Sequence, residues 1–306
     1  MTDRPVKNMA ASVRQRLQNR AKQTNRPFQE VLQYFAMERF LYRVSKSSYA
    51  DQFILKGALM LNVWQAPTSR PTRDIDFLAR MDNNVEAVVD IIREICLQSV
   101  GSDGLVFDVD SLVGQMIKED ADYSGVRVTF RASLQTARVP MQIDVGFGDV
   151  VVPEATLNDY PTLLEFESPR LRTYPRETVI AEKLEAMVKL GQLNSRMKDF
   201  YDLWLLARQF DFDGELLSNA ITQTFQNRQT ALVEHPVALT PAFTADPTKQ
   251  KQWQAFLRKS RLEIAPDQLT DLADQLKNFL IPLLTGLMKY QHMNGNWEPG
   301  GPWIID

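Results

Sequence analysis

Apolar and polar residues alternate in the first half of the chain in a way that predicts β-strands. The alternation is clean over residues 125–132 and 139–145, and shorter apolar runs near 53–56 and 74–79 are typical of strands as well. From about residue 175 the apolar positions recur mainly at helical spacing. The pattern predicts an α+β fold, in which a small mixed sheet flanked by helices precedes a mainly helical C-terminal domain.

The chain is expected to divide into three parts. Apolar stripes predict a helical arm over residues 1–45, and an α/β core follows over 46–172. Prolines mark a connection over 150–172, and a helical domain over 173–306 completes the chain. A length of 306 residues is enough for one large or two ordinary domains.

Two aspartates stand at the head of the strand predicted near 74–79. Residues two apart on a strand point from the same face, so Asp74 and Asp76 lie together, about 7 Å apart at the backbone. They repel each other unless a cation lies between them, and oxygen ligands of this kind suit Mg²⁺. The chain contains two further Asp-x-Asp triplets, at residues 108–110 and 211–213. Neither is expected to bind a metal: Asp110 is expected to cap the N-terminus of a helix, and Asp213 to form a turn that leads into a helix.

A third aspartate interrupts the apolar run of the strand at 139–145, where Asp144 has an apolar neighbour on each side. A carboxylate is costly to bury without a partner. A metal shared with Asp74 and Asp76 would supply one, since neighbouring strands lie about 4.8 Å apart. The alternative is a solvent-facing aspartate on an amphipathic strand.

A glycine marks the turn between the strand at 53–56 and an apolar helix predicted over 58–64. Gly57 at this turn lets backbone N–H groups approach a phosphate, which the N-terminus of a helix also attracts. The alternative is a plain turn from strand to helix.

A lysine lies beside the buried stripe of the helix predicted over 175–191. Lys183 can reach a triphosphate from this position as a compact positive charge. The alternative is an ion pair with Glu182, Glu185 or another neighbour.

The next amphipathic helix, predicted over 194–208, carries two aspartates three residues apart. Asp199 and Asp202 therefore share one face of this helix. The alternative for both is a surface salt bridge, with Arg196 and Lys198 as partners.

Five motifs occur in an order that is typical of one known family. They are Leu55-Lys56-Gly57-Ala58, Thr72-Arg73-Asp74-Ile75-Asp76-Phe77, Ile143-Asp144-Val145, Ala181-Glu182-Lys183-Leu184-Glu185-Ala186 and Lys198-Asp199-Phe200-Tyr201-Asp202-Leu203-Trp204. Together they resemble the AbiEii/AbiGii toxin family of nucleotidyltransferases, within the DNA polymerase β-like nucleotidyltransferase superfamily. The match extends from about residue 50 to about residue 210, and the order of the motifs is more specific than any one of them.

The resemblance implies a role for each matching residue. Asp74 and Asp76 would hold catalytic Mg²⁺, with two ions expected and Mn²⁺ as an alternative, and Asp144 would join them as a ligand and help activate the acceptor hydroxyl. Lys183 would contact nucleotide phosphates, and an aspartate of the last motif, Asp199 or Asp202, would complete the site. The expected nucleotide-binding residues are Lys56, Gly57, Ala58, Thr72, Arg73 and Lys183. Ala58 stands where the superfamily has a second glycine or a serine, which removes one hydroxyl contact to phosphate.

The resemblance also implies an activity. The chain would transfer a nucleotide from an NTP to an RNA acceptor, with tRNA the leading candidate, as the toxin of a toxin–antitoxin or phage-defence pair with a cognate antitoxin. One alternative is a kinase-like phosphotransferase that uses the same metal site and attacks the γ-phosphorus, with Thr72 as a candidate self-acceptor. Another is a catalytically silent binding protein. The oligomeric state stays open.

Charge is distributed unevenly along the chain. The net charge of −3 gives no global attraction for nucleic acid, but the first 50 residues carry ten basic residues against three acidic ones, a local charge of +7. A basic helical arm can lie along an RNA backbone. The alternative is a solvated helix face.

Other kinds of chemistry find little support in the composition. The chain has a single cysteine, Cys96, in a predicted apolar helix. A single cysteine excludes a disulfide framework within the monomer and fits a reducing cytoplasm. Residues 1–7 lack the apolar core of a signal peptide, and the longest apolar run, 279–284, is too short to span a bilayer. His235 and His292 have no serine or cysteine nearby that suggests a catalytic triad.

Overall fold

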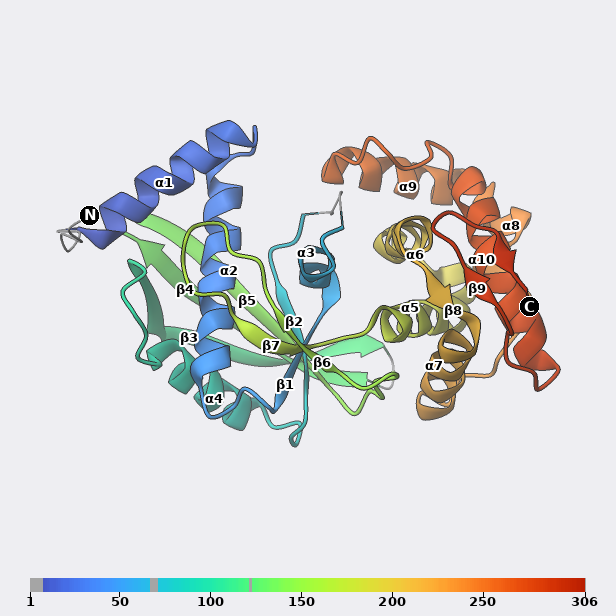
Figure 1. The fold of residues 1–306 in the computed structure, drawn as a ribbon, viewed down its shortest axis with the longest axis horizontal. Coiled ribbons are helices and arrows are strands. Elements are labelled where there is room, and N and C mark those ends of the chain that lie inside the picture. The colour runs from blue at the N-terminus through green and yellow to red at the C-terminus, as the bar shows by residue number, and fades with distance from the viewer. Residues whose placement is uncertain (1–7, 67–70, 121–122, 306) are drawn as a thin grey trace. The chain divides into compact units, whose positions relative to one another are not determined.

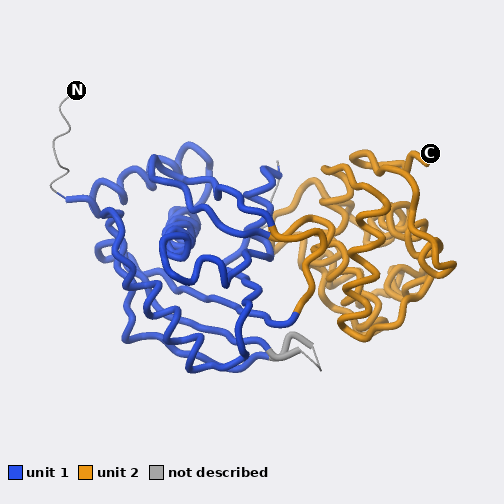
Figure 2. The backbone as a smooth tube through the Cα atoms, turned by 60° about the horizontal axis from the view of Figure 1, so that its bottom comes forward, with its two compact units in different colours: residues 1–148, 156–173 blue, residues 149–155, 174–306 orange. Residues whose placement is uncertain are grey.

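The chain forms two compact units (Figure 2). Unit 1 contains residues 1–148 and 156–173, and unit 2 contains residues 149–155 and 174–306. The computed structural model describes residues 8–66, 71–120 and 123–305. Residues 1–7, where no signal peptide is expected and where two of the ten basic residues lie, are outside this described part. The three-part division at residues 45 and 172 stays a prediction.

Among the described residues of unit 1, a seven-stranded mixed sheet forms the centre (Figure 1). The strands lie in the order β3-β4-β5-β2-β1-β7-β6, with parallel pairing between β2 and β5 and between β1 and β7. Their bounds are β1 Phe53–Lys56, β2 Ile75–Ala79, β3 Leu105–Asp120, β4 Tyr123–Leu134, β5 Ala137–Phe147, β6 Thr156–Asp159 and β7 Arg170–Thr173. The helical segments are α1 Met9–Gln23, α2 Phe28–Lys46, η1 Gly57–Leu59, α3 Met60–Val63 and α4 Val85–Leu97. The four predicted strands are thus confirmed as β1, β2, β4 and β5.

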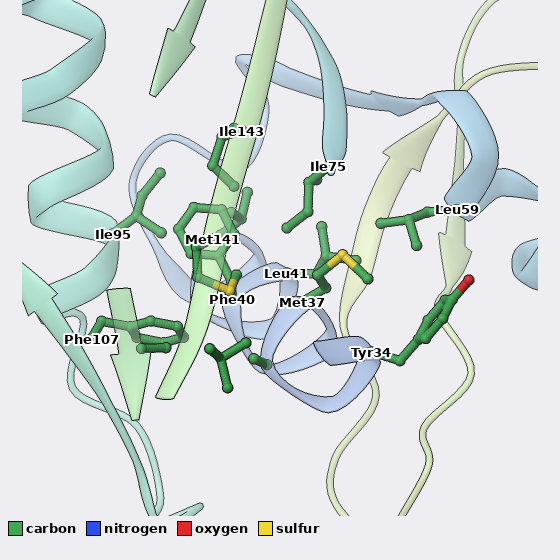
Figure 3. Close-up of a cluster of buried hydrophobic side chains, with 14 of the residues drawn as sticks. Tyr34, Met37, Phe40, Leu41, Leu59, Ile75, Ile95, Phe107, Met141 and Ile143 are labelled. Atoms are coloured by element: carbon green, nitrogen blue, oxygen red, sulfur yellow. The ribbon is translucent and has the colours of Figure 1, made fainter. Parts of the chain in front are cut away.

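Helices α2 and α4 share the buried core of unit 1 with the sheet. Phe40 of α2 and Ile95 of α4 lie in the same apolar cluster as Met141 and Ile143 of β5 (Figure 3). Successive side chains of a strand point to opposite faces. The even-numbered residues of this part of β5, Asp144 among them, therefore point to the face opposite this core.

The N-terminal helices contribute to that core, which corrects part of the basic-arm hypothesis. Arg39 and Arg43 of α2 are almost fully buried and form ion pairs with the buried carboxylate of Asp103, at 3.4 and 2.7 Å. A buried carboxylate needs such partners, so these two arginines stabilise the fold instead of facing RNA. Arg26 pairs with Glu30 and Lys46 pairs with Glu167, closer to solvent.

Two local predictions in unit 1 are wrong. Asp110 does not cap a helix but lies inside β3, at a register shift between Asp108 and Val113, where the Ser111 hydroxyl donates to the Asp108 carbonyl. The Asp110-Ser111 pair, which favours turns, therefore lies in a β-bulge instead of at a helix N-terminus. The predicted connection over 150–172 contains β6 and part of β7, short strands at the sheet edge whose pairing comes from tertiary contacts.

Unit 2 is mainly helical, as predicted. Its helical segments in the described residues are α5 Arg176–Leu190, η2 Gly191–Leu193, α6 Met197–Gln209, α7 Gly214–Asn227, η3 Val237–Leu239, α8 Pro241–Thr244, α9 Pro247–Ser260 and α10 Leu269–Met288. A small sheet joins β8 Phe212–Asp213, β9 Asn296–Trp297 and β10 Trp303–Ile304. The side chain of Asp213 accepts from the Leu216 amide at the start of α7, which confirms the predicted turn into a helix.

The C-terminal tail docks on unit 2 through its tryptophans. The indole N–H of Trp297 donates to the Ala207 carbonyl, and that of Trp303 donates to the Phe279 carbonyl. Among the described residues, no helix combines the length and the apolar character that crossing a membrane requires.

Candidate active site

Four charged side chains form a row across neighbouring strands of unit 1. Lys56 lies opposite Asp76 in the β1–β2 pair, and Asp76 lies opposite Asp144 in the β2–β5 pair. Asp144 in turn lies opposite Arg127 in the β4–β5 pair. Directly opposed residues point to the same face of a sheet. The row therefore places two carboxylates side by side with a cation on each flank.

A third carboxylate completes the cluster. Asp74 immediately precedes β2, and one carboxylate oxygen each from Asp74, Asp76 and Asp144 lie within 4.8 Å of one another. Asp144 is buried and the other two are half-buried. Three oxygen ligands from carboxylates are the donor set that Mg²⁺ and Mn²⁺ prefer, so these residues fit a divalent cation.

Gly57 makes room for one of these carboxylates. Its φ angle is +73°, a conformation that favours glycine, and a Cβ atom at this position would overlap Oδ2 of Asp76. The sequence left two roles open for Gly57, the approach of a phosphate and a plain turn from strand to helix. The structure adds that any side chain at residue 57 would displace the Asp76 carboxylate.

If Asp76 holds a catalytic cation, as the resemblance implies, Gly57→Ala is expected to reduce catalytic turnover by about 10²-fold, since a displacement of about 1 Å has an effect of that size. Backbone strain should also lower the free energy of unfolding by about 1–2 kcal/mol. Gly148→Ala is the matched control, because Gly148 has a φ of +76° but a Cβ there would meet no atom within 4 Å. Equal turnover losses in both variants would contradict the steric role of Gly57; thermal unfolding and initial rates measure both effects.

Arg127 holds Asp144 with two hydrogen bonds. Its Nε donates to Oδ1 at 2.8 Å and a terminal nitrogen donates to Oδ2 at 2.7 Å. Gln142 on the same strand donates to both oxygens, at 3.3 and 3.1 Å. The hydrogen bonds that Arg127 donates to Asp144 raise the pKa of Arg127, and the charges of Asp144, Asp74 and Asp76 raise this pKa further against the effect of partial burial. Arg127 thus interacts with the whole carboxylate cluster.

The sequence analysis missed Arg127, although a signal for it exists. The strands β4 and β5 form a hairpin in which Leu134 pairs with Ala137. Counting outward from this turn puts Arg127 opposite Asp144. The partner that a buried Asp144 requires is therefore provided in part by an arginine of the neighbouring strand.

The other predicted residues of unit 1 surround the cluster. The hydroxyl of Thr72 donates to Oδ1 of Asp74, and its backbone N–H donates to the Tyr34 hydroxyl at 3.1 Å. Thr72 is buried, so its hydroxyl orients Asp74. Ala58 is buried in η1, and Arg73 has an exposed side chain. The Nζ of Lys56 reaches toward β5, because a Cβ atom on Gly146 would lie 3.9 Å from it.

The remaining predicted residues form a second charged cluster, in unit 2. The Nζ of Lys183 on α5 lies 2.7 Å from Asp199 and 2.9 Å from Asp202, both on α6. Arg196 contacts the other oxygen of Asp199 at 2.6 Å. Burial favours the neutral acid, yet the charges of Lys183 and Arg196 hold the pKa of Asp199 below its ordinary value. Lys183 therefore forms ion pairs with neighbouring residues, as one alternative predicted. Its partners are the two aspartates of the next helix, α6.

Sequence comparison decides the family. A model of the nucleotidyl transferase AbiEii toxins of type IV toxin–antitoxin systems matches residues 39–277. The chain belongs to the AbiEii family. This match covers more than three quarters of the chain and confirms the family resemblance that the five motifs indicate. The protein is accordingly a nucleotidyltransferase-family toxin, for which a cognate antitoxin is expected.

Comparison with individual proteins finds solved structures to which this AbiEii-family chain is similar at low identity. No curated protein sequence matches it. Among solved structures it is similar to MenT4, a nucleotidyltransferase toxin from Mycobacterium tuberculosis H37Rv, at 17% identity and a TM-score of 0.47, covering 90% of this chain and 98% of that one. It is also similar to JHP933 from Helicobacter pylori, at 16% identity and 0.47, covering 84% and 97%. A third is a putative nucleotidyltransferase from Helicobacter pylori, at 14% and 0.41, covering 86% and 98%.

Proposed function

We propose that this protein transfers a nucleotide from an NTP to a terminal hydroxyl of an RNA acceptor, with tRNA as the favoured acceptor and Mg²⁺ as the cofactor. The observation that carries the proposal is the cluster of Asp74, Asp76 and Asp144, flanked in register by Lys56 and Arg127. A cluster of three carboxylates attracts divalent cations, and the flanking cations offset negative charge that phosphates would add.

The proposed reaction forms one bond and breaks another at the α-phosphorus. The acceptor oxygen bonds to the α-phosphorus, the bond from that phosphorus to the oxygen bridging to the β-phosphate breaks, and pyrophosphate leaves. The acceptor hydroxyl passes its proton to water, a transfer that Asp144 would assist. When bound, divalent cations lower the pKa of such a hydroxyl and neutralise charge on the leaving oxygens.

The residues of unit 1 divide this work. Asp74, Asp76 and Asp144 would hold the cations, two being expected as in the superfamily. Arg127 and Gln142 fix the orientation of Asp144 by donating to both of its carboxylate oxygens, while Thr72 donates to one oxygen of Asp74. Pre-oriented ligands reduce the reorganisation that binding requires.

Lys183 is proposed as a contact for nucleotide phosphates, with Asp199 and Asp202 as the residues that position its ammonium group. Both aspartates lie within 2.9 Å of Nζ, so the two ion pairs hold the ammonium group in one place. A compact, charged donor of this kind suits a triphosphate. Modification of RNA ends would account for the toxicity that membership of this family implies, with the cognate antitoxin as its restraint.

The proposal is tested by labelling RNA with NTPs that carry the label on either the α- or the γ-phosphate. Purified protein, Mg²⁺ and total cellular RNA are incubated with each NTP, and the same assay is run on Asp74→Asn. We expect label from the α-phosphate to appear on RNA, on a tRNA-sized band, and to disappear in the variant. Asp110→Asn is the matched control, since Asp110 belongs to another Asp-x-Asp triplet of unit 1 and is exposed.

Two other outcomes would contradict the proposal. Label from the γ-phosphate alone, on RNA or on the protein itself, would establish a phosphotransferase, and loss of protein label in Thr72→Val would identify the self-acceptor. No label on any acceptor, together with Mg²⁺-dependent NTP binding, would establish a catalytically silent binding protein.

A further inference from the structure

A hollow of about 500 Å³ lies on the sheet beside the carboxylate cluster. Its lining combines the polar and cationic residues Arg73, Ser111, Thr129, Arg131 and Gln142 with the apolar residues Phe130, Pro140 and Met141. Hydroxyl, amide and guanidinium groups in one concave surface are the donors that bind phosphate oxygens.

The hollow continues the row of charges that contains Asp144. Along the β4–β5 hairpin, Thr129 pairs with Gln142 and Arg131 pairs with Pro140. These pairs follow the Arg127–Asp144 pair on the same face, at steps of about 6.7 Å. Gln142 belongs to both features, since it lines the hollow and donates to the Asp144 carboxylate.

Hydrogen bonds to the backbone hold the walls of the hollow in place. Buried Gln33 of α2 donates to the carbonyls of Arg73 and Pro140, at 3.4 and 2.9 Å, and so joins two sides of it. Ser111 accepts from the Arg131 amide at 2.9 Å. The binding surface is therefore formed before any ligand arrives, which lowers the entropic cost of binding.

Arg73 and Arg131, the two arginines of the hollow, can bind a phosphate at a small cost in free energy. Arg131 pairs with Asp108 at 2.8 Å, but the side chains are 63% and 42% exposed. Exposed pairs of this kind contribute little free energy, so a phosphate can compete with Asp108 for the guanidinium. The side chain of Arg73 is exposed as well, and Arg73 directly precedes Asp74 in the sequence.

We propose that this hollow binds the sugar–phosphate backbone of the acceptor RNA next to its reacting end, an inference that rests on the proposed transfer to RNA. The strand order decides between acceptor and NTP. Lys56 and Gly57, expected at the NTP phosphates, lie on the β1 side of the carboxylates, and β5 and β4 lie on the other side in the strand order (Figure 1). The hollow is lined mostly by residues of β4 and β5. Arg73, which the resemblance placed at the nucleotide, also lines the hollow and is assigned here to the acceptor. Donor and acceptor thus approach the carboxylates from opposite flanks.

The test measures binding of a fluorescein-labelled, unstructured RNA 12-mer and of deacylated total tRNA by anisotropy over a range of salt concentrations, without NTP. We expect Arg73→Gln and Arg131→Gln each to weaken binding roughly fourfold near 0.15 M salt and to reduce the salt slope by about 0.7. We expect Asp108→Asn to tighten binding, a direction that a folding defect does not produce.

The chain offers a matched control pair elsewhere in unit 1. Arg93 and Asp90 on α4 form another exposed arginine–aspartate pair. Arg93→Gln and Asp90→Asn change the net charge by the same amounts, so they report the effect of global charge alone. Both should bind RNA as the wild type does.

Kinetics separate this inference from the proposed function. Arg131→Gln should raise the KM for RNA and leave the KM for NTP unchanged, with transfer from the α-phosphate retained at saturating RNA. Wild-type RNA affinity in Arg73→Gln and Arg131→Gln, in a protein that still transfers nucleotides, would overturn the inference alone. A raised KM for NTP would assign the hollow to the donor and overturn it too. Failure of the wild type both to bind and to label RNA would overturn both proposals.

Discussion

Asp76→Asn is expected to reduce nucleotide transfer by at least about 10³-fold while the protein stays folded. Asp76 lies at the centre of the charged row, between Lys56 on β1 and Asp144 on β5. The substitution keeps the shape of the side chain but removes one anionic ligand. A loss of about 4 kcal/mol of transition-state stabilisation corresponds to this fold-change.

The same variant should respond differently to heat and to metal. Without Mg²⁺, removal of one of three clustered carboxylates relieves repulsion, so the Tm should be equal to or higher than that of the wild type. With Mg²⁺ and NTP, the wild type should gain stability in proportion to ligand binding and the variant should not. Initial rates and thermal unfolding with and without Mg²⁺ measure both effects. A variant with a lowered Tm and an unchanged response to Mg²⁺ would show that Asp76 has a structural role only.

Lys183→Met is expected to destabilise unit 2 by about 3 kcal/mol, because it leaves Asp199 and Asp202 buried without their shared cation. Urea unfolding followed by tryptophan fluorescence measures this, since Trp204, Trp253, Trp297 and Trp303 all lie in unit 2. The triple variant Lys183→Met, Asp199→Asn, Asp202→Asn is the control and should recover most of the lost stability. If the single variant is as stable as the wild type, the buried cluster does not support the fold.

The pH dependence of this cluster has a definite sign. The pKa of Asp199 is lower in the folded protein than in the unfolded chain, because Lys183 and Arg196 outweigh the effect of burial. Ionised Asp199 therefore stabilises unit 2 fully above about pH 4, near the unfolded pKa, and this contribution is lost as the pH falls through the lower folded value. Lys183→Met should weaken that dependence.

The parts of this protein that follow local patterns were predictable from sequence. Alternation identified β4 and β5, and the spacing of Asp74 and Asp76, just before and at the start of β2, correctly placed both carboxylates beside Asp144. The predicted turn into a helix at Asp213 is also confirmed, because a helix cap is formed by residues close together in the chain.

The parts that failed depend on contacts between distant residues. The bulge at Ser111 in β3 has the same local sequence as a helix cap and is determined by pairing with β4. The role of Arg127 depends on the register of the hairpin, and the requirement for glycine at Gly57 depends on where Asp76 points. Basic residues of α2 looked like an RNA-binding arm, whereas the burial of Arg39 and Arg43 depends on Asp103, some 60 residues away.

The most direct test of the central claim is Mn²⁺ binding measured by electron paramagnetic resonance, with a non-hydrolysable NTP analogue, on the wild type and on Asp76→Asn. If Asp74, Asp76 and Asp144 hold the catalytic cations, the wild type binds Mn²⁺ and the variant loses that binding, with Asp110→Asn unchanged. Equal Mn²⁺ binding by the wild type and Asp76→Asn, in a protein that transfers nucleotides, would place the catalytic cations elsewhere and contradict the account.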